Sequence, residues 1–87
     1  MHNDSVRSAI AAEVRAELAR QQKTQRWAAD VLDMTQPSVQ LRLAGRRAFR
    51  AEELVTLADA LGVSADRFLP ASSAEVSGEV SAKVSAA

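Results

Sequence analysis

The sequence of 87 residues contains no cysteine, and it contains no long apolar run. The absence of cysteine excludes a disulfide-stabilised scaffold, a zinc site with thiolate ligands and a cysteine nucleophile. No uninterrupted apolar stretch approaches the roughly 20 residues that span a bilayer, and the charged residues among the first twenty positions argue against a signal peptide. Hydrophobic residues make up 47% of the chain and charged residues 25%, which is the composition of a folded globular protein of one small domain.

The chain also lacks a net charge, because 11 Lys and Arg residues balance 11 Asp and Glu residues. The charges are nevertheless segregated along the chain. Residues 20–50 carry seven basic residues against two acidic ones, whereas residues 51–87 carry two basic and six acidic ones. A local excess of positive charge is what a phosphate-binding surface requires, but a solvated basic face without a partner explains it equally well.

Apolar residues at helical spacing predict an all-α fold. A cap within residues 3–5 and four apolar residues at intervals of four predict a first helix that runs to about residue 21, with these four side chains in the core. They are Val6, Ile10, Val14 and Leu18. Thr24 is the expected N-cap of a second, short helix that ends before Asp33.

A third helix is predicted from Thr35, its N-cap, to Gly45, which can take the left-handed conformation that ends a helix. Pro37 fits the first turn of this helix, where a missing amide proton costs nothing. Val39 and Leu43 are its expected buried pair.

A loop over residues 46–50 follows, anchored to the core by Phe49. A fourth helix ends at Gly62 and buries an i, i+3, i+4, i+7 set, which consists of Leu54, Leu57, Ala58 and Leu61. Ser64 is expected to cap a last helical turn that carries Phe68 and Leu69, and Pro70 closes the domain. The sequence therefore predicts a bundle of five short helices over residues 1–70.

Residues 71–87 form a tail of different composition, rich in Ala, Ser and Val. Strict alternation from Val76 to Ala86 is typical of a strand, although Val76, Val80 and Val84 are four apart and also allow a helix. A single strand is unstable alone, and the same strand of a second subunit is its simplest partner. The tail is therefore interpreted either as a dimerisation strand or as a disordered solubilising segment.

The two short helices between Thr24 and Ala44 must cross, which is the arrangement of a helix-turn-helix. The stretch KTQRWAADVLDMTQPSVQLRLAGRRAF, followed by ELVTLADALGVSADRFL, resembles the lambda repressor and Cro type (XRE family) of helix-turn-helix protein, in the versions common in actinobacteria and their phages. The resemblance covers about residues 6–69. It departs from the usual pattern at Trp27, where a polar residue is usual, and at Asp33, where the turn usually has Gly. Asp tolerates the left-handed conformation better than most residues, so the turn can form.

The resemblance implies that the third helix lies in the major groove of DNA and that the N-termini of the second and third helices face phosphates. A helix N-terminus suits an anion, because it presents free amide protons and a partial positive charge. With one side of the third helix buried, a rotation of about 100° per residue directs positions 36, 37, 40 and 41 to solvent. The candidate base-reading residues are Gln36, Pro37, Gln40 and Leu41. The glutamines can read adenine, whereas Pro37 and Leu41 contact apolar atoms such as a thymine methyl.

Phosphate contacts are expected at the two helix N-termini and beyond the recognition helix. By the resemblance, Gln25 touches phosphate and supports the first base-reading glutamine. Arg42 lies at the flank of the buried stripe, where a phosphate and a guanine contact are equally plausible. The residues expected to contact phosphate, alone or together with a base, are Thr24, Gln25, Thr35, Ser38, Arg42, Arg46, Arg47 and Arg50.

Two further features allow a protein contact. Trp27 shares a helix face with Val31, and the two either pack beside the core or expose a patch for a partner. Val76, Val80 and Val84 of the tail are the other candidates. No metal-ligand cluster, Gly-rich phosphate loop or nucleophile with a base is present in the sequence, so we expect no enzyme, no cofactor and no metal.

The sequence thus predicts a DNA-binding transcriptional regulator of the phage repressor or Cro kind, acting in the bacterial cytoplasm. One such domain reads few base pairs, so a homodimer on a palindromic operator of double-stranded DNA is expected. Seventeen residues after Pro70 leave no room for a ligand-sensing domain, and neither a small-molecule ligand nor a membrane is expected as a partner. The alternative is a protein-interaction module, such as the antitoxin of a toxin–antitoxin pair.

Overall fold

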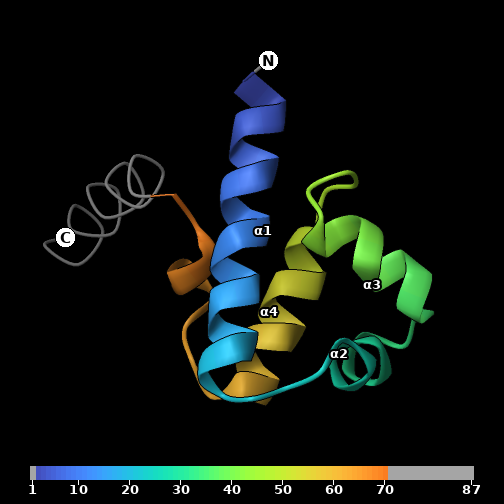
Figure 1. The fold of residues 1–87 in the computed structure, drawn as a ribbon. Helices are drawn as coiled ribbons and strands as arrows, with labels where there is room; N and C mark the ends of the chain where they lie inside the picture. The colour runs from blue at the N-terminus through green and yellow to red at the C-terminus, as the bar shows by residue number, and fades with distance from the viewer. Residues whose placement is uncertain (1, 71–87) are drawn as a thin grey trace, which may run out of the picture.

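A computed structural model describes residues 2–70 of the chain, with side chains from residue 5 onward. It contains four α-helices, α1 (His2–Arg20), α2 (Gln25–Leu32), α3 (Gln36–Leu43) and α4 (Ala51–Leu61), followed by one 3-10 helix, η1 (Ala65–Phe68). α2 packs on α3 and α4, α1 packs on α3 and η1, and η1 also packs on α4 (Figure 1). The all-α class is confirmed, except that the fifth element is a single 3-10 turn. The strand and the contacts predicted for Val76, Val80 and Val84 lie outside the described residues.

Three predicted hydroxyl caps begin α2, α3 and η1. The Oγ1 atom of Thr24 accepts a hydrogen bond from the backbone N–H of Trp27 at 2.9 Å, and that of Thr35 accepts from the N–H of Ser38 at 3.3 Å. The Oγ atom of Ser64 starts η1 in the same way. Each cap satisfies an amide that the helix itself leaves without a partner, which typically contributes about 1 kcal/mol.

Left-handed residues end α2 and α4 and follow the end of α3. Asp33 adopts φ 54° and ψ 50° at the end of α2, so it accommodates the conformation for which glycine is usual. Gly62 ends α4 at φ 72°, and Gly45 follows α3 at φ 77°. A Cβ atom at Gly45 would also lie 3.2 Å from Oγ of Ser8. Gly45 therefore serves both the backbone turn and the close approach of α1 to the end of α3.

The core lies between α1, α4 and the α2–α3 pair, with Phe68 of η1 fully buried. All predicted core residues of α3 and α4 are buried. Val6 was wrongly predicted as a core residue, because it is 43% exposed. The first turns of α1 extend beyond the rest of the body (Figure 1), so the apolar face of the helix has fewer neighbours there. Phe49 packs against the core and anchors its loop as predicted.

Glu17 is the one charged side chain in the buried class among the described residues, at 3% exposure. Its carboxylate accepts hydrogen bonds from Nε2 of Gln21 at 2.8 Å and from Nη2 of Arg20 at 2.7 Å, and Arg67 of η1 lies 3.5 Å away. These two hydrogen bonds, with Gln21 the larger cause, lower the pKa of Glu17 below its ordinary value of 4.5. Since Gln21 also donates to the carbonyl of Leu61 at 2.9 Å, the cluster ties the end of α1 to the end of α4 and to η1.

Candidate nucleic-acid interface

α2 and α3 pack against each other across the turn at residues 33–35, and α2 also packs on α4. The small side chains of Ala28 and Ala29 are buried where α2 meets its neighbours, which allows a close approach. The N–H of Met34 donates to the carbonyl of Ala29 at 3.0 Å and closes the turn. The two helices therefore form the predicted helix-turn-helix, and α4 and α1 support them from behind.

One face of α3 is open to solvent. Gln36, Pro37 and Gln40 are exposed as predicted, and Leu41 is half-buried. Within residues 2–70 none of these four side chains takes part in a hydrogen bond. Pro37, Gln40 and Leu41 line a hollow of about 450 Å³ together with Ala44 and Arg46. The face thus offers amide groups and apolar surface side by side, which is the mixture that base edges in the major groove present.

Exposed arginines follow α3 directly. The backbone amides of Arg46 and Arg47 both donate to the carbonyl of Leu41, at 2.9 and 3.3 Å, so the loop folds back on the end of α3. Arg50, at the start of α4, forms a 3.5 Å ion pair with Glu52 in which both side chains are more than 70% exposed. An ion pair so exposed to water contributes little to stability, so the guanidinium of Arg50 can leave Glu52 and bind another anion. Of these three cations, Arg46 lies beside the open face of α3, where it lines the same hollow as Gln40 and Leu41.

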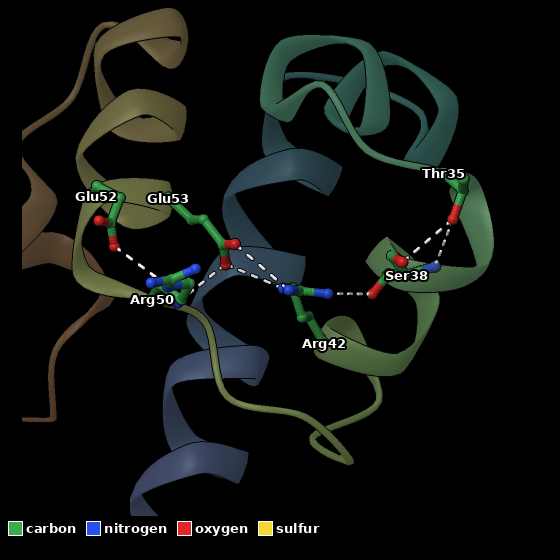
Figure 2. Close-up of polar contacts among 6 residues, drawn as sticks. All are labelled: Thr35, Ser38, Arg42, Arg50, Glu52 and Glu53. Carbon is green, nitrogen blue, oxygen red and sulfur yellow. Dashed lines mark hydrogen bonds and ion pairs between the residues drawn. The ribbon is translucent and has the colours of Figure 1, made fainter.

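Arg42 is held inside the protein (Figure 2). Its Nε atom lies 3.0 Å from Oε1 of Glu53, its Nη2 atom 3.4 Å from Oε2, and its Nη1 atom donates to the carbonyl of Ser38 at 3.0 Å. The Arg42 and Glu53 side chains are only 12% and 13% exposed. In the structure the guanidinium of Arg42 thus holds α3 against α4, and the phosphate or guanine contact expected from the sequence stays a prediction.

Glu53 has a second function at the start of α4. Its Oε1 atom also accepts a hydrogen bond from the backbone N–H of Arg50 at 2.9 Å, which is the acidic half of a capping box (Figure 2). One carboxylate therefore fixes both α3 and the end of the arginine-bearing loop. Nothing in the sequence pattern indicates this, because the helix dipole alone explains an acidic residue in the first turn of a helix.

The remaining predicted site residues occupy the helix starts. Thr24 and Thr35 are exposed caps, and Gln25 is exposed in the first turn of α2. The hydroxyl of Thr35 also donates to Oγ of half-buried Ser38 at 3.1 Å. The structure therefore brings the N-termini of α2 and α3, the open face of α3 and the arginine loop together in one region of the molecule.

Arg15 of α1 was missed by the sequence reasoning. Its Nη1 atom donates to the carbonyl of Leu43, the last residue of α3. Its side chain also lines a hollow of about 250 Å³ with Gln25, Gln40, Leu43 and Ala44. No local signal could have found this position, because 28 residues separate Arg15 from Leu43.

The Trp27–Val31 face lies against the core. Both side chains are half-buried and pack on the buried cluster, the first of the two interpretations given above. Lys23 covers Trp27 further, with its Nζ atom 5.0 Å from the ring centre. A protein contact through Trp27 and Val31 stays a prediction.

Two findings concern what the described residues lack. Residues 2–70 contain no group of three or more acidic or histidine side chains that could hold a metal ion. None of the helices in this part of the chain is long and apolar enough to cross a membrane.

Comparison with known proteins gives one family and one solved structure. The model of the Helix-turn-helix family matches residues 14–68. The fold is similar to the crystal structure of the clp gene regulator ClgR from Corynebacterium glutamicum, with a TM-score of 0.68 and 23% sequence identity over 91% of this chain and 80% of that chain. The comparison with curated proteins finds no match.

Proposed function

The chain belongs to the helix-turn-helix family of DNA-binding transcriptional regulators, and from this premise we propose that it is a repressor or Cro-like regulator that reads operator DNA with α3. It acts in the bacterial cytoplasm, where its DNA lies. The base-reading residues are Gln36, Pro37, Gln40 and Leu41.

The observation that carries the proposal is the open face of α3. Four neighbouring side chains there take no part in hydrogen bonds within residues 2–70, although two of them are amides. A glutamine amide can donate and accept at adenine N6 and N7, and Leu41 and Pro37 suit a thymine methyl. Arg46, Arg47 and Arg50 supply phosphate contacts, which position the protein and carry little sequence information.

The helix starts support the same orientation. Thr24 and Thr35 satisfy one amide each. The amides of Gln25 and Arg26 at the start of α2, and that of Gln36 at the start of α3, point outward from the ends of the helices, whereas Pro37 has no amide proton. Gln25 extends this donor surface beside Gln40, with which it shares a hollow. Amides of this kind are ready partners for backbone phosphates.

A homodimer on a palindromic operator completes the proposal. α3 has eight residues, so one copy can contact only a few base pairs. Two copies one helical turn apart double the contacted sequence and give the affinity that a specific site requires.

Selection of bound duplexes from a random DNA library, followed by binding measurements from 50 to 200 mM salt, tests the proposal. We expect an enriched two-fold symmetric sequence and an affinity that falls steeply with salt. Gln36→Ala is expected to weaken the enriched site by about 1–3 kcal/mol and to relax selection at one base pair. Thr56→Ala, an exposed change on α4, is the control and should alter neither property. Absence of an enriched sequence, or binding that salt does not affect, would refute the proposed function as a DNA-binding regulator.

A further inference from the structure

We propose that Arg15 of α1 binds a backbone phosphate of DNA, on the side of the major groove opposite to Arg46. The proposal rests on the proposed function and adds a contact made from outside the two helices of the motif. It concerns a residue whose sequence position gives no hint of such a role.

The guanidinium of Arg15 is exposed and already oriented. One N–H of Nη1 donates to the carbonyl of Leu43, and this side chain makes no other hydrogen bond or ion pair within the described residues. A guanidinium carries five N–H donors, so four of them remain for a further partner. Because the anchor restricts the side chain, less conformational entropy is lost when it binds an anion.

Two hollows adjoin along α3 and place Arg15 relative to the base-reading face. The first contains Arg15 and Gln25, and the second contains Arg46. Gln40 and Ala44 line both of them. The edge of α3 that carries Gln40 and Ala44 is therefore a ridge, with Arg15 on one side and Arg46 on the other.

The geometry of the major groove requires such an arrangement. The groove is about 12 Å wide and is bounded by one phosphate backbone on each side, so an inserted helix has phosphates on both flanks. Arg46 serves one flank. On the other flank Gln25 offers only neutral donors, and Arg15 adds the positive charge that a phosphate requires.

A purely structural role for Arg15 is the competing explanation. A cation at the carbonyl end of a helix stabilises that helix, and Leu43 is the last residue of α3. The two roles change different quantities. A cap contributes to the stability of the free protein, whereas a phosphate contact releases counterions from DNA and contributes to the salt dependence of binding.

The test compares binding to the enriched operator at a series of salt concentrations for three variants. Arg15→Met keeps the length of the side chain without its charge and is expected to reduce the slope of log K against log salt by about 0.9, the value of one phosphate contact. Arg15→Lys is expected to keep the slope. Arg67→Gln is the matched control, because it removes one positive charge from η1, which packs on α1 and α4. The enriched sequence should be the same for all variants.

An unchanged slope for Arg15→Met together with a lower Tm would overturn the proposal and leave Arg15 as the cap of α3. Ethylation of single phosphates provides a test with the unaltered protein. Interference is expected on both strands around each half-site, and interference on the strand facing Arg46 alone would also overturn it. Failure to enrich any operator would instead refute the proposed function, and this proposal with it.

Discussion

Replacement of Glu53 by glutamine is expected to lower the free energy of unfolding by about 1.5 kcal/mol. Oε1 of Glu53 accepts from Nε of Arg42 and from the N–H of Arg50, at 3.0 and 2.9 Å. Glutamine keeps an oxygen acceptor for the Arg50 amide, because Glu and Gln both accept from the N-cap amide at the third position of a helix. The change is therefore restricted to the ion pair with Arg42.

The magnitude follows from the exposure of the pair. Hydrogen bonds to charged groups contribute about 1.5–3 kcal/mol when covered, and exposed ion pairs about 0–1 kcal/mol. At 12% and 13% exposure the Arg42–Glu53 pair is mostly covered, which sets the value near the lower end of the first range. For a domain of this size about 1.5 kcal/mol corresponds to a fall in Tm of roughly 6–12 °C. Glu53→Ala also loses the cap, which adds about 1 kcal/mol.

Thermal unfolding followed by circular dichroism measures these changes. Glu52→Gln is the matched control, because Glu52 is the adjacent residue and its ion pair with Arg50 is exposed. It is expected to change stability by less than about 0.5 kcal/mol. A double-mutant cycle with Arg42→Met should show a coupling energy of about 1 kcal/mol. Equal effects of the Glu52 and Glu53 changes, or additivity in the cycle, would refute the reasoning.

Three further changes test other features of the fold. Asp33→Gly is expected to raise the free energy of unfolding by about 0.5 kcal/mol, because glycine adopts the left-handed conformation without a Cβ penalty; a lower melting temperature would contradict this. The lowered pKa of Glu17 means that its ionised form is favoured by folding, so its contribution is complete above pH 4.5 and is lost as the pH falls through the folded-state pKa. Below pH 4.5 the free energy of unfolding should therefore fall less steeply with pH for Glu17→Gln than for the unaltered protein. Parallel curves for the two proteins would disprove the lowered pKa of Glu17. Phe68→Ala, which empties a fully buried site, is expected to cost about 3–5 kcal/mol in urea unfolding, and an unchanged midpoint would show that η1 contributes little.

Features that depend on near neighbours in the chain could be predicted from the sequence. A cap such as Thr24 or Thr35 needs only an amide three residues ahead, so its residue type and position suffice. Once Val39 and Leu43 are expected to be buried, the rotation of each residue about the helix axis fixes which face of α3 is open to solvent. The same rule failed at Val6, because periodicity indicates which face of α1 is apolar and not how far the neighbouring helices extend along it.

Features that depend on distant partners could not be predicted. Arg42 pairs with a residue eleven positions away, and Arg15 with one 28 positions away. Glu17 lies on the face of α1 that packs on the core, where burial of a carboxylate without partners would be costly. Contacts with Arg20, Gln21 and Arg67 compensate for this cost. Whether an arginine binds DNA or an internal carboxylate is decided by this packing, and helical spacing contains no information about it.

The division of α3 into two faces has a consequence for how such a regulator can change its target. Val39, Arg42 and Leu43 hold the helix in place, while the side chains of Gln36, Pro37 and Gln40 are exposed, that of Leu41 is half-buried, and none of the four makes a hydrogen bond within the described residues. Side chains that support nothing else can be exchanged at little cost to folding. If α3 reads DNA as proposed, new operator preferences can be selected at these four positions while the rest of the domain is retained.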